Sequence, residues 1–142
     1  MAERRFRGLK AGGIKLDKRY RVFTNNSLLR EKYGGQLDIS FVDGQYIDVL
    51  KAVRDMIHKG SKLMTHPLMG SIKPNETPYR SIIIKDGPAL ELESLEIIES
   101  SIATAEKFQR DNRVPCWDEK VLEDFRFVDL KLFESALDSI IK

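Results

Sequence analysis

Four short segments of the chain have the composition of β-strands. Residues 20–24 (YRVFT) are rich in β-forming residues, and residues 37–42 (LDISFV) alternate apolar with polar positions. A third short strand is predicted over residues 61–65, where the chain enters a polar stretch. Residues 81–85 (SIIIK) hold three consecutive isoleucines, which indicates a strand covered on both faces, as in the interior of an α/β sheet.

Between these strands the apolar residues recur at steps of three and four. This spacing predicts helices over residues 45–59 and 91–110. The cluster Asn25-Asn26-Ser27 predicts the end of the first strand and the cap of a short helix over residues 27–33. Gly60 stands where a residue with left-handed backbone often ends a helix.

The C-terminal third is predicted to be helical. Asp118 and Asp129 each precede a stretch with helical spacing, so each is expected to cap a separate helix. The complete order predicts an α/β fold: a three-layer sandwich with a mainly parallel four-stranded sheet, a Rossmann-like first half and a helical C-terminus. With the strands numbered along the chain, we expect the order 2-1-3-4 and leave the direction of the fourth open.

The charges are unevenly distributed. The 142 residues include 24 Lys and Arg and 22 Asp and Glu, but residues 1–19 hold seven basic and two acidic residues. We therefore expect a basic, flexible N-terminal extension, residues 1–19, and a single α/β domain, residues 20–142. The extension is interpreted either as a solvated leader, including one that results from a start codon placed too early, or as an arm for nucleic acid or an acidic partner.

Cysteine content and hydropathy indicate the compartment. The single cysteine, Cys116, excludes an internal disulfide. No stretch approaches the roughly 20 apolar residues of a membrane span, and the basic extension lacks the apolar core of a secretory signal. These features predict a protein of the reducing cytoplasm without membrane contact.

Candidate chemistry gathers in residues 63–79 (LMTHPLMGSIKPNETPY), a polar stretch between apolar elements. In open parallel sheets, ligands bind where the carboxyl ends of the strands meet. The segments that follow the first three predicted strands are therefore expected to converge, and they contain Thr24, Asn25 and Asn26, then Asp43 and Gly44, then Thr65 and His66.

Within the polar stretch, His66 is the side chain whose ordinary pKa lies near neutrality, so it is the candidate catalytic acid or base. The alternative is a buried histidine bonded to loop backbone. Gly70, Ser71 and Lys73 suggest an anion cradle of backbone amides, a hydroxyl and an ammonium group. The alternative for Lys73 is a solvated loop residue.

Residues 74–78 are predicted to form a rigid turn in which Asn75 bonds its own backbone. Glu76 is expected to pair with Lys73 or His66, and Tyr79 to close the site. The candidate ligand-binding residues are therefore Thr24, Asn25, Asn26, Gly44, Thr65, Gly70, Ser71, Lys73, Asn75, Glu76 and Tyr79.

Common cofactor and metal motifs are missing from the sequence. No GxGxxG follows the first predicted strand, the stretch GSIKPNET is not a P-loop, and no CxxC or HExxH occurs. We therefore expect no cofactor and no metal site. Cys116 is separated from His66 by 49 intervening residues and is interpreted as a packing residue in preference to a nucleophile.

Several segments together resemble the GrdX family. They are TNN at 24–26, YIDVLKAVRDMIHKG at 46–60, THPLMGSIKPNETPYRSI at 65–82, SLEIIESSIATAEKF at 94–108 and EKVLEDFRFVDL at 119–130. Members are small proteins encoded beside the glycine, sarcosine or betaine reductase subunits of amino-acid-fermenting anaerobes. The family has no established activity, so the resemblance implies a pathway and assigns no catalytic residue.

Two functions are compatible with these observations. The first is an accessory protein of the reductase pathway that binds a small anionic metabolite, or a reductase subunit, through the loop over residues 65–79. The second is a small enzyme that uses His66 as acid or base, with Lys73 and Ser71 holding a carboxylate or phosphate and Asn25 orienting the substrate. Nucleic-acid binding is disfavoured because residues 20–142 are mildly acidic.

Overall fold

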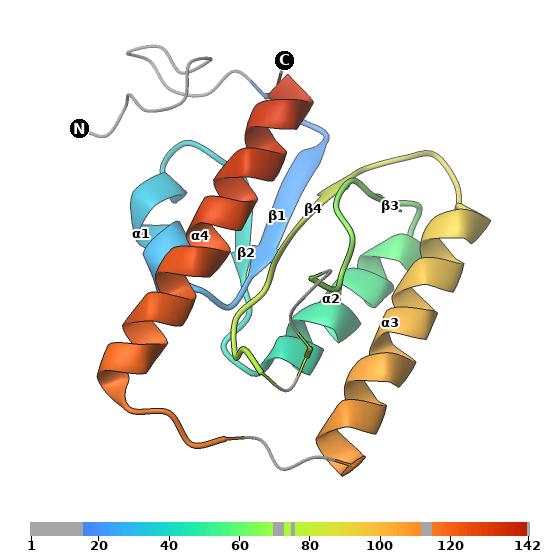
Figure 1. Cartoon of the computed structure of the whole chain (residues 1–142). Coiled ribbons are helices and arrows are strands. Elements are labelled where there is room, and N and C mark those ends of the chain that lie inside the picture. The colour runs from blue at the N-terminus through green and yellow to red at the C-terminus, as the bar shows by residue number, and fades with distance from the viewer. Residues whose placement is uncertain (1–15, 70–72, 75, 112–114, 142) are drawn as a thin grey trace.

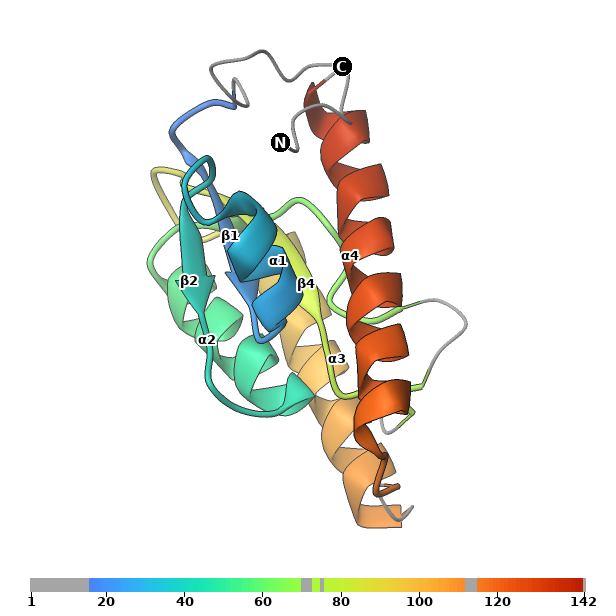
Figure 2. The same ribbon diagram turned by 90° about the vertical axis from the view of Figure 1, so that its left-hand side faces the viewer.

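The protein forms a sheet with helices on both faces, which confirms the α/β class and the layered arrangement (Figures 1 and 2). The computed structural model describes residues 16–69, 73–74, 76–111 and 115–141, and in these residues there are four strands and four helices. The strands are β1 (Tyr20–Thr24), β2 (Ile39–Phe41), β3 (Lys62–Leu63) and β4 (Ser81–Lys85). The helices are α1 (Ser27–Tyr33), α2 (Tyr46–His58), α3 (Leu92–Asp111) and α4 (Glu119–Ile141).

The sheet is mixed, so the prediction of a mainly parallel sheet is wrong. Its strand order is β2-β1-β4-β3, not the expected 2-1-3-4. β1 and β2 are parallel, with Val22 opposite Ile39, whereas β4 is antiparallel to both β1 and β3. The Rossmann-like description of the first half stays a prediction.

The connection between β3 and β4 explains this difference. Residues 64–80 contain no helix in their described part, and a chain that returns to a sheet without a crossover helix pairs its strands antiparallel. The three isoleucines of β4 also require cover on both faces, which only an inner position provides. β3, with two residues and an exposed Lys62, occupies the edge.

Two apolar cores lie on the two faces of the sheet. Ile82 and Ile84 pack with α2 and α3, while Ile83 packs with α1 and α4, and all three are fully buried. The uninterrupted isoleucine run therefore belongs to a strand covered on both sides, as predicted.

Two predicted helix ends are confirmed. The Asn26 side chain accepts a hydrogen bond from the backbone N–H of Leu28 at 3.0 Å, which caps α1. Gly60 has a φ of +113°, and a Cβ atom at this position would lie 2.6 Å from the carbonyl oxygen of Gly87.

The C-terminal part forms one helix instead of the two predicted. Asp118 caps α4, because its Oδ1 accepts from the N–H of Val121 at 3.0 Å. Asp129 lies inside α4 and is fully buried, so it is not a cap. Its carboxylate binds Asn26 and Ser81 instead of a helix N-terminus, and the buried stripe continues past it through Phe133.

The N-terminal extension lies mostly outside the described residues, so the division into extension and domain stays a prediction. Leu16 packs against the core that α1 and α4 share. None of the helices in the described part of the chain has the length and apolarity that crossing a bilayer requires.

Candidate functional site

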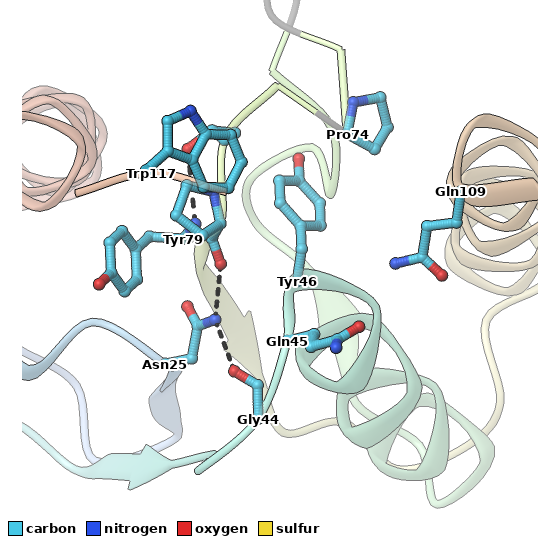
Figure 3. Close-up of a pocket in the computed structure, with 10 residues that line it drawn as sticks. Asn25, Gly44, Gln45, Tyr46, Pro74, Tyr79, Gln109 and Trp117 are labelled. Carbon is cyan, nitrogen blue, oxygen red and sulfur yellow. Dashed lines mark hydrogen bonds between the residues drawn. The ribbon is translucent and has the colours of Figure 1, made fainter. Parts of the chain in front are cut away.

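A cavity of about 320 Å³ lies where β1 and β2 end. β3 runs in the same direction as these strands, because β1 and β3 are both antiparallel to β4. The predicted convergence of the segments after β1 and β2 with the polar loop is therefore present, although only one strand pair is parallel. The lining side chains come from five parts of the chain (Figure 3) and are Asn25, Gly44, Gln45, Tyr46, Pro74, Thr77, Pro78, Tyr79, Gln109 and Trp117.

Asn25 holds the cavity wall together. Its side-chain amide donates to the carbonyl oxygens of Gly44 at 3.0 Å and Pro78 at 2.8 Å (Figure 3). Its Oδ1 accepts from the backbone N–H of Arg80 at 3.0 Å. Asn25 is only 7% exposed, and both amide hydrogens are used. It fixes the segment before α2 and the loop before β4 relative to β1, so its N–H groups are not free for a ligand.

Tyr46 and Arg80 hold the turn at the start of the polar loop. The Tyr46 hydroxyl donates to the carbonyl oxygen of Pro67 at 3.2 Å, and Arg80 Nε donates to the same oxygen at 2.9 Å. Arg80 Nη2 donates to the carbonyl oxygen of His66. Burial raises the pKa of the Tyr46 phenol to about 12, so the ring is neutral at physiological pH.

The beginning of α4 borders the other side of the cavity. Trp117 precedes this helix and packs edge-to-face against Phe125, with the ring centres 5.2 Å apart. The hydroxyl of Tyr79 accepts from Arg126 Nη1 at 2.8 Å, and the guanidinium carbon lies 5.7 Å from the centre of the Tyr79 ring. Arg126 also pairs with Glu119. Tyr79 is thus tied to α4.

Three of the predicted ligand-binding residues, Asn25, Gly44 and Tyr79, line the cavity together. Thr65 does not, because its Oγ1 accepts from the N–H of Ile83 at 3.0 Å. His66 is exposed, and its Nδ1 accepts from the N–H of Leu68 at 3.0 Å. The prediction of His66 as acid or base stays a prediction, but its side chain is not among those that line the cavity.

The remaining predicted residues of the polar loop lie beside the cavity or cannot be placed. Lys73 is exposed next to Pro74, with Nζ 5.8 Å from the centre of the Phe108 ring. Glu76 Oε1 accepts from the backbone N–H of Lys73 at 3.3 Å, so these two residues meet through the backbone of Lys73. Gly70, Ser71 and Asn75 lie outside the described residues. The proposed anion cradle therefore stays a prediction.

Thr24 and Asn26 belong to a buried polar cluster behind the cavity. The hydroxyls of Thr24 and Ser81 are hydrogen-bonded at 2.6 Å, and Ser81 Oγ donates to Asp129 Oδ2 at 2.6 Å. Asn26 Nδ2 donates to the same oxygen at 2.9 Å. Burial raises the pKa of the Asp129 carboxyl, although Ser81, Asn26 and Arg80 favour its charged form. The cluster connects β1, β4 and α4.

The chemistry of the cavity is aromatic and amide rather than ionic. None of the ten lining residues that the structure describes carries a formal charge. Within the same part of the chain, no group of three or more His, Cys, Asp or Glu residues is arranged to hold a metal ion. The cavity is suited to binding a small molecule by shape, ring contacts and a few hydrogen bonds.

Sequence reasoning did not identify Tyr46, Gln109 and Trp117 as site residues. Tyr46 shares the helical spacing of the apolar residues in the segment 45–59, which predicts a core position for it. A usable signal was present for Trp117, because a tryptophan between Pro115 and Asp118 stands outside any predicted element. Gln109, near the end of α3, gives no comparable signal.

Comparison with known proteins places the chain in one family. No curated protein and no solved structure matches it. A sequence model described as "GrdX-like protein" matches residues 21–138, which include three complete strands, all of β1 except Tyr20 and nearly all of α4. The match covers most of the chain and confirms the resemblance drawn from the sequence segments. The protein is therefore a member of the GrdX-like family.

Proposed function

We propose that the protein is an accessory component of a glycine, sarcosine or betaine reductase system and binds a small, carboxylate-bearing metabolite in the cavity. Family membership supports an association with glycine reductase. The observation that carries the binding proposal is the cavity at the ends of β1 and β2, which is lined by three aromatic rings and three side-chain amides. Concave, mostly apolar sites with a few polar groups are typical of small-molecule binding.

Cationic side chains beside the cavity supply a place for a carboxylate. Lys73 precedes the lining residue Pro74, and Arg126 donates to the hydroxyl of the lining residue Tyr79, so both flank the cavity without lining it. Arg126 already pairs with Glu119, which leaves Lys73 as the partner for a ligand carboxylate. A ligand that places its carboxylate toward Lys73 can leave its other end among the aromatic rings. This arrangement favours a molecule with one anionic end over one with negative charge throughout.

A binding role is favoured over the enzyme that uses His66. The titratable residues among the described lining are Tyr46 and Tyr79. The pKa of Tyr46 is raised to about 12, far from the operating range of a general base at neutral pH. A reaction inside the cavity would therefore need an acid or base supplied by residues outside the described lining.

Isothermal titration calorimetry with the full chain tests the proposal. The ligands are glycine, sarcosine, glycine betaine, acetate and acetyl phosphate. Gln109→Phe places a ring in the cavity and should weaken binding by about tenfold, which corresponds to about 1.4 kcal/mol. Arg110→Phe, on the same helix but outside the lining, is the matched control and should bind like the wild type.

Two results would redirect the proposal. If no ligand binds to the folded protein, the reductase-subunit alternative becomes the leading function and a pull-down against those subunits is the next measurement. If His66→Ala abolishes binding while the circular dichroism spectrum remains unchanged, the alternative of an enzyme that uses His66 is favoured. The proposal expects His66→Ala to bind like the wild type.

A further inference from the structure

We propose that the cavity recognises a methylated ammonium group, so that its ligand class is small zwitterions with a quaternary ammonium at one end and a carboxylate at the other. This inference rests on the proposed function, because it names the group that the same cavity binds. It is carried by two aromatic rings and by the absence of charge, and so of any carboxylate partner for an N–H cation, from the described lining.

Tyr46 and Trp117 provide the rings. Tyr46 donates its hydroxyl hydrogen to Pro67 and packs mostly in the apolar core, with 3% of its surface exposed. It therefore offers the cavity a small part of its ring and no donor, and Trp117 is the main ring. The T-shaped contact with Phe125 holds the plane of Trp117. Figure 3 shows the two rings extending into the same region, with Pro74 nearby. Aromatic faces attract cations, and tryptophan does so most strongly among the side chains.

Tyr79 is not needed for this recognition. Its ring extends to the side of the cavity where α4 begins, away from Tyr46 (Figure 3). Arg126 already contacts that ring and bonds its hydroxyl at 2.8 Å. The Tyr79 ring therefore has a cationic partner from within the protein, and we assign the ligand to Tyr46 and Trp117.

The uncharged lining discriminates between kinds of ammonium group. A primary ammonium carries three N–H donors that need acceptors when they are taken out of water. The ten described lining residues include no carboxylate. The acceptors that they offer are neutral: backbone carbonyls, of which those of Gly44 and Pro78 already accept from Asn25, and side-chain oxygens such as that of Gln109. A quaternary ammonium has no N–H group, so this environment leaves none of its groups unsatisfied. The same chemistry makes a primary amine the poorer ligand.

The test compares charged ligands with neutral isosteres in the full chain. Glycine betaine is titrated against 3,3-dimethylbutanoate, and choline against 3,3-dimethylbutan-1-ol, because each pair has nearly the same shape but differs in the cationic nitrogen. Glycine serves as the primary amine. We expect each ammonium ligand to bind roughly fivefold or more tightly than its isostere, and glycine betaine to bind more tightly than glycine. Calorimetry measures all affinities, and Trp117, the only tryptophan of the chain, adds a fluorescence signal from the site.

Two variants separate ring chemistry from packing. Trp117→Leu keeps an apolar side chain but removes the ring, and should reduce the preference for glycine betaine over its isostere to near one. Trp117→Phe keeps a ring and should retain a preference. Both variants are titrated by calorimetry after circular dichroism confirms that they are folded.

The outcomes distinguish this inference from the proposed function. Equal affinity of glycine betaine and 3,3-dimethylbutanoate would overturn the ammonium assignment while leaving a small-molecule site. Binding of acetate or acetyl phosphate without any ammonium ligand would do the same. If none of the probes binds to the folded protein, both the inference and the proposed function are wrong.

Discussion

Asn25 provides a sharp test of how the cavity wall is held. Its side chain makes three hydrogen bonds, to Gly44, Pro78 and Arg80, at 2.8 to 3.0 Å. At about 1 kcal/mol net for each bond, Asn25→Ala should reduce the free energy of unfolding by about 3 kcal/mol. Gly44 is exposed, so water can replace the bond to its carbonyl, which makes about 3 kcal/mol the upper end of the expected loss.

At neutral pH, Asn25→Asp should lower the free energy of unfolding more than Asn25→Ala does. The introduced carboxylate keeps the bond from Arg80, but the atom that replaces Nδ2 is an oxygen that faces the carbonyl oxygens of Gly44 and Pro78. Protonation of the introduced carboxylate restores one donor and removes the repulsion. The additional loss in the free energy of unfolding, relative to Asn25→Ala, should therefore shrink as the pH falls below the pKa of this carboxyl.

Urea unfolding followed by circular dichroism at pH 7 and at pH 4.5 measures both effects for the two variants. Each variant is compared with the wild type at the same pH. The reasoning is refuted if Asn25→Asp is as stable as the wild type at pH 7, or if its deficit relative to Asn25→Ala does not depend on pH.

Three further predictions concern stability. Burial raises the folded-state pKa of Asp129 above its ordinary value of 3.8, so the folded protein holds this proton more tightly than the unfolded chain. Its contribution to the free energy of unfolding is therefore greatest below pH 3.8 and falls as the pH rises through the folded pKa; Asp129→Asn should flatten this slope in urea titrations, and an unchanged slope would contradict the assignment. Gly60→Ala should lower stability by about 1 to 3 kcal/mol in thermal denaturation, because φ is +113° and the added Cβ meets Gly87 at 2.6 Å, whereas the control Gly35→Ala, with nothing within 4 Å of its Cβ, should not. Glu99→Ala removes exposed pairs with Arg54 at 3.5 Å and His58 at 4.0 Å, and a loss above about 1 kcal/mol by the same measurement would be unexpected.

The elements of the fold were predictable because their signals are local. The caps at Asn26 and Asp118 and the left-handed residue at Gly60 depend on a few neighbouring positions. The order of the strands is different in kind. It depends on whether β4 pairs antiparallel in the middle of the sheet. This is decided by how the connection from β3 to β4 returns to the sheet and by which of these two strands takes the inner position.

Asp129 shows why the sequence predicts two C-terminal helices where the structure has one. Aspartate at the start of an apolar stretch is a common helix cap, and the local sequence contains nothing that contradicts this interpretation. The partners that change its role, Asn26 and Ser81, are 103 and 48 residues away in sequence. A buried carboxyl bound by side chains from two strand ends is a tertiary arrangement, and no periodicity along α4 reveals it.

The candidate site stays a prediction, and the polar loop of residues 65–79 has two parts in the cavity. It lines the cavity through Pro74, Thr77, Pro78 and Tyr79, and it helps to hold the wall together. The backbone carbonyls of His66 and Pro67 accept from Arg80 and Tyr46. The side chains of His66 and Glu76 accept from backbone N–H groups of the loop itself. A loop held at both ends loses less conformational freedom when a ligand binds, which raises affinity without any added contact.

The rings that we assign to the ligand come instead from the start of α2 and the segment before α4. α2 and α4 pack on opposite faces of the sheet, and the segments at their beginnings both line the cavity beside the loop. Substitutions in the loop backbone contacts should therefore impair binding through the position of Tyr46, even when no loop side chain touches the ligand. A distinctive sequence motif can in this way mark a site while the recognition chemistry lies in residues outside it.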